Sequence, residues 1–238
     1  MREISVHQVT EAIEDMCVRA NYYLSEDMTA CLKKAQKTEN TELGKKILDQ
    51  LQKNLEIAGT DMIPICQDTG MAVIFLEIGQ DVHFIDGNLT DAVNEGVRKG
   101  YEKGYLRKSV VSDPILRENT HDNTPAVIHT KIVDGEHVSI TFAPKGFGSE
   151  NMSRIFMLKP ADGIDGVKHA ILTAVKDAGP NACPPMVVGV GVGGTFEKAA
   201  CMAKEALTRD LDDKPEIKWV NELEEEMLCK INQLGIGP

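Results

Sequence analysis

Apolar residues recur at helical spacing through the first sixty residues of the chain. Two stripes carry the pattern: Val9, Ile13, Met16, Cys17 and Ala20, followed by Leu43, Ile47, Leu48, Leu51 and Leu55. Residues three or four positions apart lie on one face of an α-helix and can be buried together. We therefore expect a helical N-terminal third, with Ser25 at a helix N-cap and Gly59 at the end of the second stripe.

Four later segments have the apolar or β-branched composition of strands. Residues 71–79, MAVIFLEIG, predict a buried strand, and residues 186–194, MVVGVGVGG, predict a strand of small residues. Residues 126–133 and 136–143, AVIHTKIV and EHVSITFA, flank the dipeptide Asp134-Gly135. Because this dipeptide suits a type I′ turn, the sequence predicts an antiparallel hairpin here.

Helical patterns return between and after these strands. One helix is expected from Thr90 through Tyr101, a second over residues 164–178, a third from residue 196 with Thr195 as its cap, and a last amphipathic helix that ends at Gly235. The segment from Gly104 to Pro125 is instead rich in turn formers and charge. It is expected to be an extended loop, and its length alone suggests a function.

This order of elements predicts an α/β or α+β fold. A helical N-terminal third precedes mixed short sheets, which include an antiparallel hairpin and are surrounded by helices. The chain has 238 residues, of which 42% are hydrophobic, and this is enough to bury a sizeable core. With no internal repeat and no low-complexity segment, we expect a single domain over residues 1–238.

The formal net charge of −11 argues against nucleic acid and anionic membranes as partners, because both require basic patches. A small anionic substrate could bind only in a locally positive pocket. The charged N-terminus does not resemble a signal peptide, and the longest apolar run, residues 71–76, is too short to span a bilayer. We therefore expect a cytoplasmic protein.

The six cysteines fall into two groups. In a reducing compartment they would be thiols, metal ligands or nucleophiles rather than disulfides. Four lie within helical patterns and are interpreted as small packing residues: Cys17, Cys31, Cys201 and Cys229. Cys66 and Cys183 instead lie in the proline-containing loops DMIPICQDTG and GPNACPPM. They are either buried turn residues or thiolates held rigidly for chemistry; a cluster with three cysteine ligands would keep one iron open as a Lewis acid.

Five motifs resemble one family in the same order along the chain. They are ICQDTG, GYLRKSVVSDP, KGFGSEN, NACPP and the terminal LGIGP, and they run from about Asp61 to the end. Together they resemble the α component of the class I, iron–sulfur fumarate hydratases and the related L-tartrate dehydratases. CQDTG with a distant ACPP is the specific part of this resemblance.

The resemblance implies roles for single residues. Cys66 and Cys183 would be two of the three thiolate ligands of a [4Fe-4S] cluster. Gln67 and Asp68 would face the substrate, with Asp68 near the proton-transfer chemistry. Arg107 would pair with a substrate carboxylate, a strong and directional contact. Gly148 would let backbone N–H groups approach the substrate closely.

Taken without the resemblance, two of these residues have simpler interpretations. Asp68 could serve only as an Asx-turn residue. Arg107 could be an ordinary surface charge beside Lys108.

The resemblance also implies a reaction and a partner. The reaction would be the reversible hydration of fumarate to L-malate, a step of the tricarboxylic acid cycle, on the open iron of the cluster. In this family the α sequence continues past LGIGP to a third cysteine, so we expect that ligand to lie outside these 238 residues. A separate β subunit would supply further catalytic groups and enclose the dicarboxylate, which implies a hetero-oligomer.

Three alternatives remain at this point. The substrate could be L-tartrate, because CQDTG and CPP would bind the cluster in either enzyme. The glycines of Gly189-Val-Gly191-Val-Gly193-Gly194 fit a dinucleotide-binding GxGxxG pattern, although they lie where the strand should be rather than in the turn after it. The chain could also be an interaction module that keeps the fold without a cluster.

Overall fold

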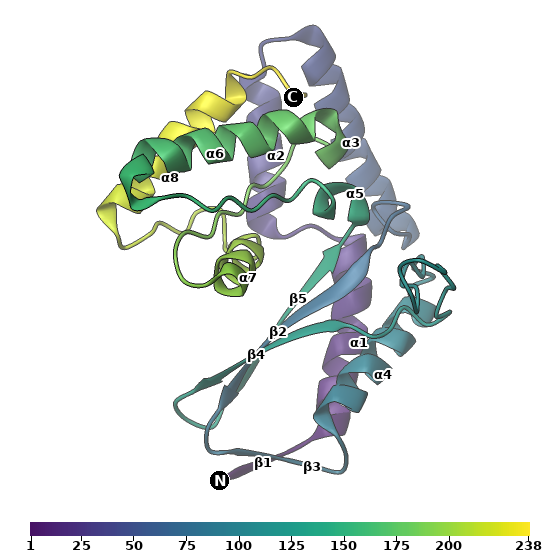
Figure 1. Cartoon of the computed structure of the whole chain (residues 1–238). Coiled ribbons are helices and arrows are strands. Elements are labelled where there is room, and N and C mark those ends of the chain that lie inside the picture. The colour runs from purple at the N-terminus through teal and green to yellow at the C-terminus, as the bar shows by residue number, and fades with distance from the viewer. The chain divides into compact units, whose positions relative to one another are not determined.

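The computed structural model describes residues 1–238 and divides into two compact units (Figure 1). Unit 1 comprises residues 1–25 and 51–147, and unit 2 comprises residues 26–50 and 148–238. Helices are combined with short sheets of mixed strand direction, which confirms the predicted α/β or α+β class. The assignment of residues 1–238 to one functional domain stays a prediction. None of the helices is long and apolar enough to cross a membrane.

The sheet at the centre of unit 1 has three strands in the order β4–β2–β5. They are β4 (Val127–Val133), β2 (Met71–Gly79) and β5 (Val138–Lys145). The central strand β2 is parallel to β4 and antiparallel to β5. The predicted hairpin pairing is therefore wrong, although both strands form close to where the sequence places them. The antiparallel partner of β5 is β2, which lies between the two expected hairpin strands.

The connection between β4 and β5 crosses the end of β2, and hydrogen bonds there explain the arrangement. The N–H of Gly79 donates to the carbonyl of His137 at 2.8 Å, and the N–H of Asp81 donates to the carbonyl of Gly135 at 3.0 Å. A Cβ on Gly79 would lie only 2.3 Å from that Gly135 oxygen. Gly135 has the positive φ that the sequence predicts, +93°, but it serves a connection that spans β2.

Two helices cover one face of this sheet. α1 (Val6–Tyr22) and α4 (Leu89–Lys103) lie side by side against it (Figure 1). Alternate β2 residues enter the core that they share: Ala72, Ile74, Leu76 and Ile78. Close contact of the helices requires glycine on α4, because a Cβ on Gly100 would lie 2.5 Å from the Cβ of Cys17. The N-terminal helical prediction is confirmed for α1, and the helix expected from Thr90 begins slightly earlier, after the N-cap Asn88.

Unit 1 also contains one feature that was not predicted, a pair of short strands, and one that was, a long loop. β1 (Arg2–Ser5) and β3 (Val82–Ile85) form a parallel pair that the sequence analysis did not identify, since each strand has only four residues. The segment after Gly104 was expected to be an extended loop, and this is confirmed. Apart from one isolated bridge between Val111 and Asn119, it contains no strand or helix before β4.

Unit 2 is mainly helical around a smaller core. Its helices are α2 (Glu26–Thr38), α6 (Gly163–Ala178), α7 (Phe196–Ala206) and α8 (Lys218–Asn232), with the short α5 (Phe147–Glu150) beginning at the unit boundary. The boundary also falls within α3 (Glu42–Asp61). Two 3₁₀ turns, η1 (Pro160–Asp162) and η2 (Gly179–Ala182), flank α6. Ile171 of α6 packs with Leu223 and Met227 of α8, and the two helices lie side by side in Figure 1.

The strand predicted over residues 186–194 does not form. This segment belongs to no sheet and leads into α7 after Thr195. A Cβ on Gly189 would lie 2.2 Å from the carbonyl oxygen of Ala203, and one on Gly191 would lie 2.2 Å from that of Ala199. The glycines thus let the segment lie against the backbone of α7. This packing accounts for them without a phosphate, and the strand of a dinucleotide-binding unit is missing.

Candidate functional site

The loop that carries Cys66 joins the end of α3 to β2. Its backbone is fixed one residue earlier, where the Ile65 N–H donates to the Asn21 carbonyl at 2.8 Å and the Ile65 carbonyl accepts from Asn54 Nδ2 at 2.8 Å. The side chains of Cys66 and Gln67 are both exposed. A backbone held by hydrogen bonds, with an exposed thiol, is an arrangement that suits a terminal metal ligand. It also excludes the interpretation of Cys66 as a buried turn residue.

Asp68 is the centre of a hydrogen-bonded junction in unit 1. Its Oδ1 accepts from the Gly70 N–H at 3.1 Å and pairs with Nη1 of Arg107 at 3.3 Å. Its Oδ2 accepts from the Phe147 N–H at 3.1 Å. The bond to Gly70 is the Asx turn that the local sequence predicts. Asp68 also joins three segments that are distant in sequence, so the simple turn interpretation is incomplete.

Gly70 sits where the loop enters β2, and its conformation demands glycine. Its φ is +64°, and a Cβ there would lie 2.2 Å from the carbonyl oxygen of Lys145. Side chains rarely adopt this backbone region, and no atom can sit at such a distance from a carbonyl oxygen. The glycine of CQDTG therefore sets the close approach of the loop to the end of β5, beside Asp68.

Arg107 comes from the long loop after α4 and is brought to Asp68. Its carbonyl accepts from Thr69 Oγ1 at 2.9 Å, and its Nη1 lies 3.4 Å from Ser109 Oγ. The side chain remains 52% exposed, and its Nε and Nη2 have no partner within the protein. Arg107 is thus oriented by a carboxylate and still has donors for an anion.

Two buried side chains, Asn123 and Tyr101, bond to the loop of Asp68, and Asn123 also bonds to the loop of Arg107. Asn123 is fully buried; its Oδ1 accepts from the N–H groups of Ser109 at 2.6 Å and Val110 at 3.2 Å, and its Nδ2 donates to the Gly70 carbonyl at 3.0 Å. The hydroxyl of Tyr101 donates to the carbonyl of Thr69 at 2.8 Å. Burial raises the pKa of Tyr101 well above its ordinary value, so the hydroxyl stays protonated as a donor.

The sequence analysis missed Asn123 and Tyr101. Asn123 lies in the polar stretch NTHDNTP, where nothing distinguishes it from its exposed neighbours. Tyr101 was expected only as part of a helix. Their roles depend on tertiary contacts, which no local pattern encodes.

Cys183 and Gly148 lie in unit 2. Cys183 follows η2, has an exposed side chain, and adopts a left-handed backbone with φ 58° and ψ 68°. Its N–H donates to the Pro180 carbonyl at 3.0 Å. Gly148 lies near the same loop, because a Cβ on it would lie 3.6 Å from the Asn181 carbonyl oxygen. The structure therefore brings Asp68 and Arg107 together in unit 1, and Gly148 and the Cys183 loop together in unit 2.

Of the four cysteines expected to be packing residues, Cys17 has that burial, whereas Cys31 and Cys229 are exposed and do not. Cys17 is fully buried, and burial raises the pKa of its thiol to about 12, as a packing residue requires. Cys201 is partly buried, whereas Cys31 and Cys229 are exposed on helices. No three His, Cys, Asp or Glu side chains of the chain gather in an arrangement that could hold a metal ion. Cys66 and Cys183 are both exposed and both lie in loops, which is compatible with cluster ligands, and that role stays a prediction.

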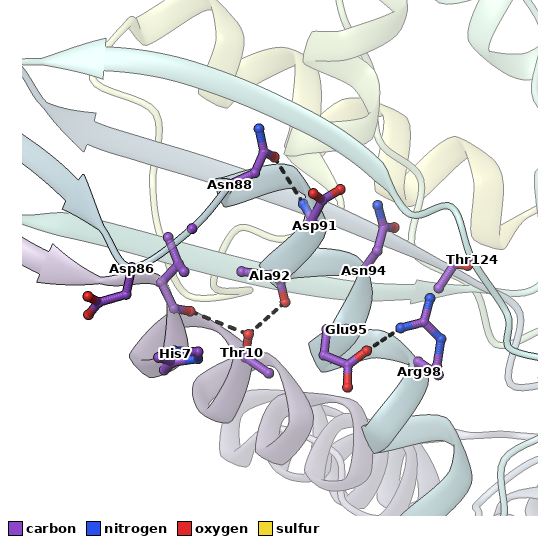
Figure 2. Close-up of a pocket in the computed structure, with 12 residues that line it drawn as sticks. His7, Thr10, Asp86, Asn88, Asp91, Ala92, Asn94, Glu95, Arg98 and Thr124 are labelled. Atoms are coloured by element: carbon purple, nitrogen blue, oxygen red, sulfur yellow. Dashed lines mark hydrogen bonds and ion pairs between the residues drawn. The ribbon is translucent and has the colours of Figure 1, made fainter.

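A hollow of about 560 Å³ lies between α1 and α4 and is open to solvent (Figure 2). Its polar groups serve the fold. Thr10 donates to the carbonyls of Val6 and Ala92, and Arg98 pairs with Glu95 (Figure 2). None of the residues predicted to bind substrate or metal lines this hollow. The junction at Asp68 remains the better candidate site.

Comparison with known proteins extends over both units. A model of the fumarate hydratase (Fumerase) family matches residues 10–238. A Methanocaldococcus jannaschii protein, provisionally named L(+)-tartrate dehydratase subunit alpha, is 39% identical over 237 residues, 97% of this chain and 82% of that protein. The L(+)-tartrate dehydratase subunit alpha of Escherichia coli K12 is 28% identical over 240 residues, 100% of this chain and 79% of that protein. A Shigella sonnei protein of the same name has the same identity and coverage.

Proposed function

Because the chain belongs to the fumarate hydratase (Fumerase) family, we propose that it is the alpha-type subunit of an iron–sulfur hydro-lyase that interconverts fumarate and L-malate. The observation that carries this proposal is the junction of Asp68 with Arg107. It presents an oriented and half-exposed guanidinium in a chain of net charge −11. Such a guanidinium meets the need of a dicarboxylate substrate for a local positive charge.

Cys66 and Cys183 would hold the cluster. Both thiols are exposed and both lie beside a hydrogen-bonded backbone, which suits terminal thiolate ligands. The proposal requires both sulfur atoms to bind one [4Fe-4S] cluster, with a third ligand from elsewhere. When bound, an iron without a thiolate ligand supplies a Lewis acid that makes hydroxide a better leaving group.

The residues of the site would bind the substrate and handle its proton. Arg107 would hold one carboxylate through Nε and Nη2, while Nη1 stays on Asp68. A carboxylate has about four acceptor positions. Two donors bind Oδ1 of Asp68 and one binds Oδ2, which leaves one acceptor position on Oδ2. That position would lie near the proton that is transferred. Gln67 would contact the substrate, and the backbone near Gly148 would donate to it.

A β-type subunit would complete the site. The relatives named as alpha subunits support this, because that name implies a partner chain. Arg107 is exposed to solvent, and a dianion bound there needs further donors and exclusion of water. We therefore propose a hetero-oligomer, located in the cytoplasm, in which the partner covers the exposed side of Arg107.

L-tartrate is the second candidate substrate. The relatives favour it, since the three reported above are named as L(+)-tartrate dehydratase alpha subunits. Tartrate and malate are both four-carbon hydroxydicarboxylates, and the contacts proposed for Arg107 serve either molecule. The two substrates are therefore separated by assay.

The test is anaerobic reconstitution with iron, sulfide and the β-type subunit, followed by assays on fumarate, L-malate and L-tartrate. Visible absorbance and iron content should fall in Cys66→Ser and Cys183→Ser, with Cys31→Ser as a matched exposed control. Arg107→Lys should lower kcat/KM by roughly 10–100-fold, because the bidentate contact is lost. The neighbouring Lys108→Ala should not. A preparation without iron absorbance, or iron content that the two loop cysteines do not affect, would refute the proposal.

A further inference from the structure

Residues 234–238, which follow α8 and its C-cap Gln233, form a segment, here called the tail, that lies against the Cys183 loop. A Cβ on Gly237 would lie 2.4 Å from Cγ and 2.7 Å from Cβ of Pro184. Pro184 directly follows Cys183. Two sequence motifs separated by almost fifty residues, NACPP and LGIGP, therefore meet in unit 2 at one glycine and one proline ring.

We propose that this tail positions Cys183, with Gly237 as the positioning residue. The proposal rests on the role of Cys183 as a cluster ligand given above. Gly237 would touch neither substrate nor cluster. It acts through Pro184, whose ring is bonded to the residue that carries the thiol.

The Cys183 loop needs such a support because hydrogen bonds hold only one side of it. On the upstream side, the Cys183 N–H donates to the Pro180 carbonyl at 3.0 Å. On the downstream side, Pro184 and Pro185 have no N–H to donate. On that side the tail packs against the ring of Pro184 and can limit its movement.

The conformation of Cys183 makes this support consequential. Its φ of 58° and ψ of 68° lie in the left-handed region, which residues other than glycine seldom occupy. A loop released from the tail can relax toward the ordinary region, and that rotation changes the direction of the Cα–Cβ bond. The thiol would then point elsewhere, while the helices of unit 2 would remain intact.

Glycine is required at position 237 for two reasons that can be separated. Its φ is +70°, and the space for a Cβ is filled by Pro184. Gly235 in the same tail has a φ of +67°, but no atom lies within 4 Å of the position of its Cβ. Gly235→Ala therefore imposes the same backbone cost as Gly237→Ala without the collision, which makes it a matched control.

The experiment uses the full chain without its cluster, under reducing and anaerobic conditions. Hydrogen exchange of the peptide containing residues 179–183 is measured by mass spectrometry. The alkylation rate of Cys183 by iodoacetamide is measured beside that of Cys66 as internal reference. In Gly237→Ala we expect exchange and Cys183 alkylation to rise by at least about three-fold, with Cys66 unchanged, because the loop opens more often. Gly235→Ala should match the wild type in both measurements.

Two outcomes overturn the proposal: Gly237→Ala within about two-fold of the wild type in exchange, or Gly235→Ala equal to Gly237→Ala. Both glycines lie outside the two hydrophobic cores, so both variants should fold, and equal melting temperatures would verify this. Because neither measurement uses iron, the result is independent of the proposed function. If the tail holds the loop and Cys183→Ser still binds iron normally, the proposed function fails and the positioning by Gly237 stands.

Discussion

Replacing Asn123 by alanine should release the loop of Arg107 from the loop of Asp68. Asn123 is fully buried and makes three hydrogen bonds to backbone groups: it accepts from Ser109 and Val110 and donates to Gly70. Alanine can replace none of them. The backbone groups would remain in place without partners, and at least two of them lie away from water.

The magnitude follows from the burial of these groups. Leaving a buried donor or acceptor unsatisfied costs about 1–3 kcal/mol. Three such groups would cost roughly 3–9 kcal/mol, less if a water molecule enters the vacated space and satisfies one of them. Asn119 provides a control in the same loop, since its Nδ2 donates to the Lys108 carbonyl at 2.9 Å and its Oδ1 accepts from His121. Asn119 is exposed, so water can replace its bonds and Asn119→Ala should cost about 1 kcal/mol or less.

The assay is urea unfolding of the apoprotein together with hydrogen exchange of the peptide that spans residues 106–112. The free energy of unfolding should fall at least about 2 kcal/mol further in Asn123→Ala than in Asn119→Ala. The amides of Ser109 and Val110 should exchange faster only in the first variant. Equal free energies of unfolding in the two variants would refute the reasoning, because Asn123 differs from Asn119 in its burial, its third hydrogen bond and its left-handed φ of 61°, and each difference raises the cost of alanine.

Two further predictions concern the same unit. Gly70→Ala should lower the free energy of unfolding by roughly 3 kcal/mol or more, because its Cβ would collide with the Lys145 carbonyl. Gly135→Ala should cost only about 1 kcal/mol for the left-handed backbone, because Gly135 has a φ of +93° and no atom lies within 4 Å of its Cβ position. Equal losses of unfolding free energy in urea would contradict this comparison. Burial raises the pKa of Cys17 from 9.0 to about 12, so its contribution to stability is fully present below pH 9 and is lost as pH rises from 9 to 12. Unfolding measured against pH should show a flatter decline for Cys17→Ala than for the wild type over that interval, and parallel curves would contradict the assignment.

The elements that could be predicted from sequence are those whose buried residues recur at regular spacing along the chain. α1, α4, α6 and α8 each bury one apolar stripe, and the stripes fixed their approximate positions. The spacing of apolar residues does not indicate which strands pair with one another. The dipeptide Asp134-Gly135 indicates a turn, but nothing in the turn sequence indicates that β2 lies between β4 and β5. In the same way, MVVGVGVGG has the composition of a strand, and only the position of α7 explains its glycines.

The candidate site was partly predictable for a related reason. Asp68 and Arg107 are functional residue types in recognisable motifs, and the structure brings them to 3.3 Å of each other. Asn123 has no motif and no periodicity, although it connects the loops of both residues. The functional roles of all the predicted site residues stay predictions: Cys66, Gln67, Asp68, Arg107, Gly148 and Cys183.

The crossing of residues 134–137 over the end of β2 has a practical consequence for protein engineering. The tip of a simple hairpin usually tolerates an inserted tag, because its backbone bonds only to itself. Here the carbonyls of Gly135 and His137 accept from Asp81 and Gly79, so an epitope or fluorescent protein spliced between Asp134 and Gly135 would pull open the end of the central strand. Fusion partners for localisation studies should avoid this turn, even though its surface position and its Asp-Gly sequence recommend it.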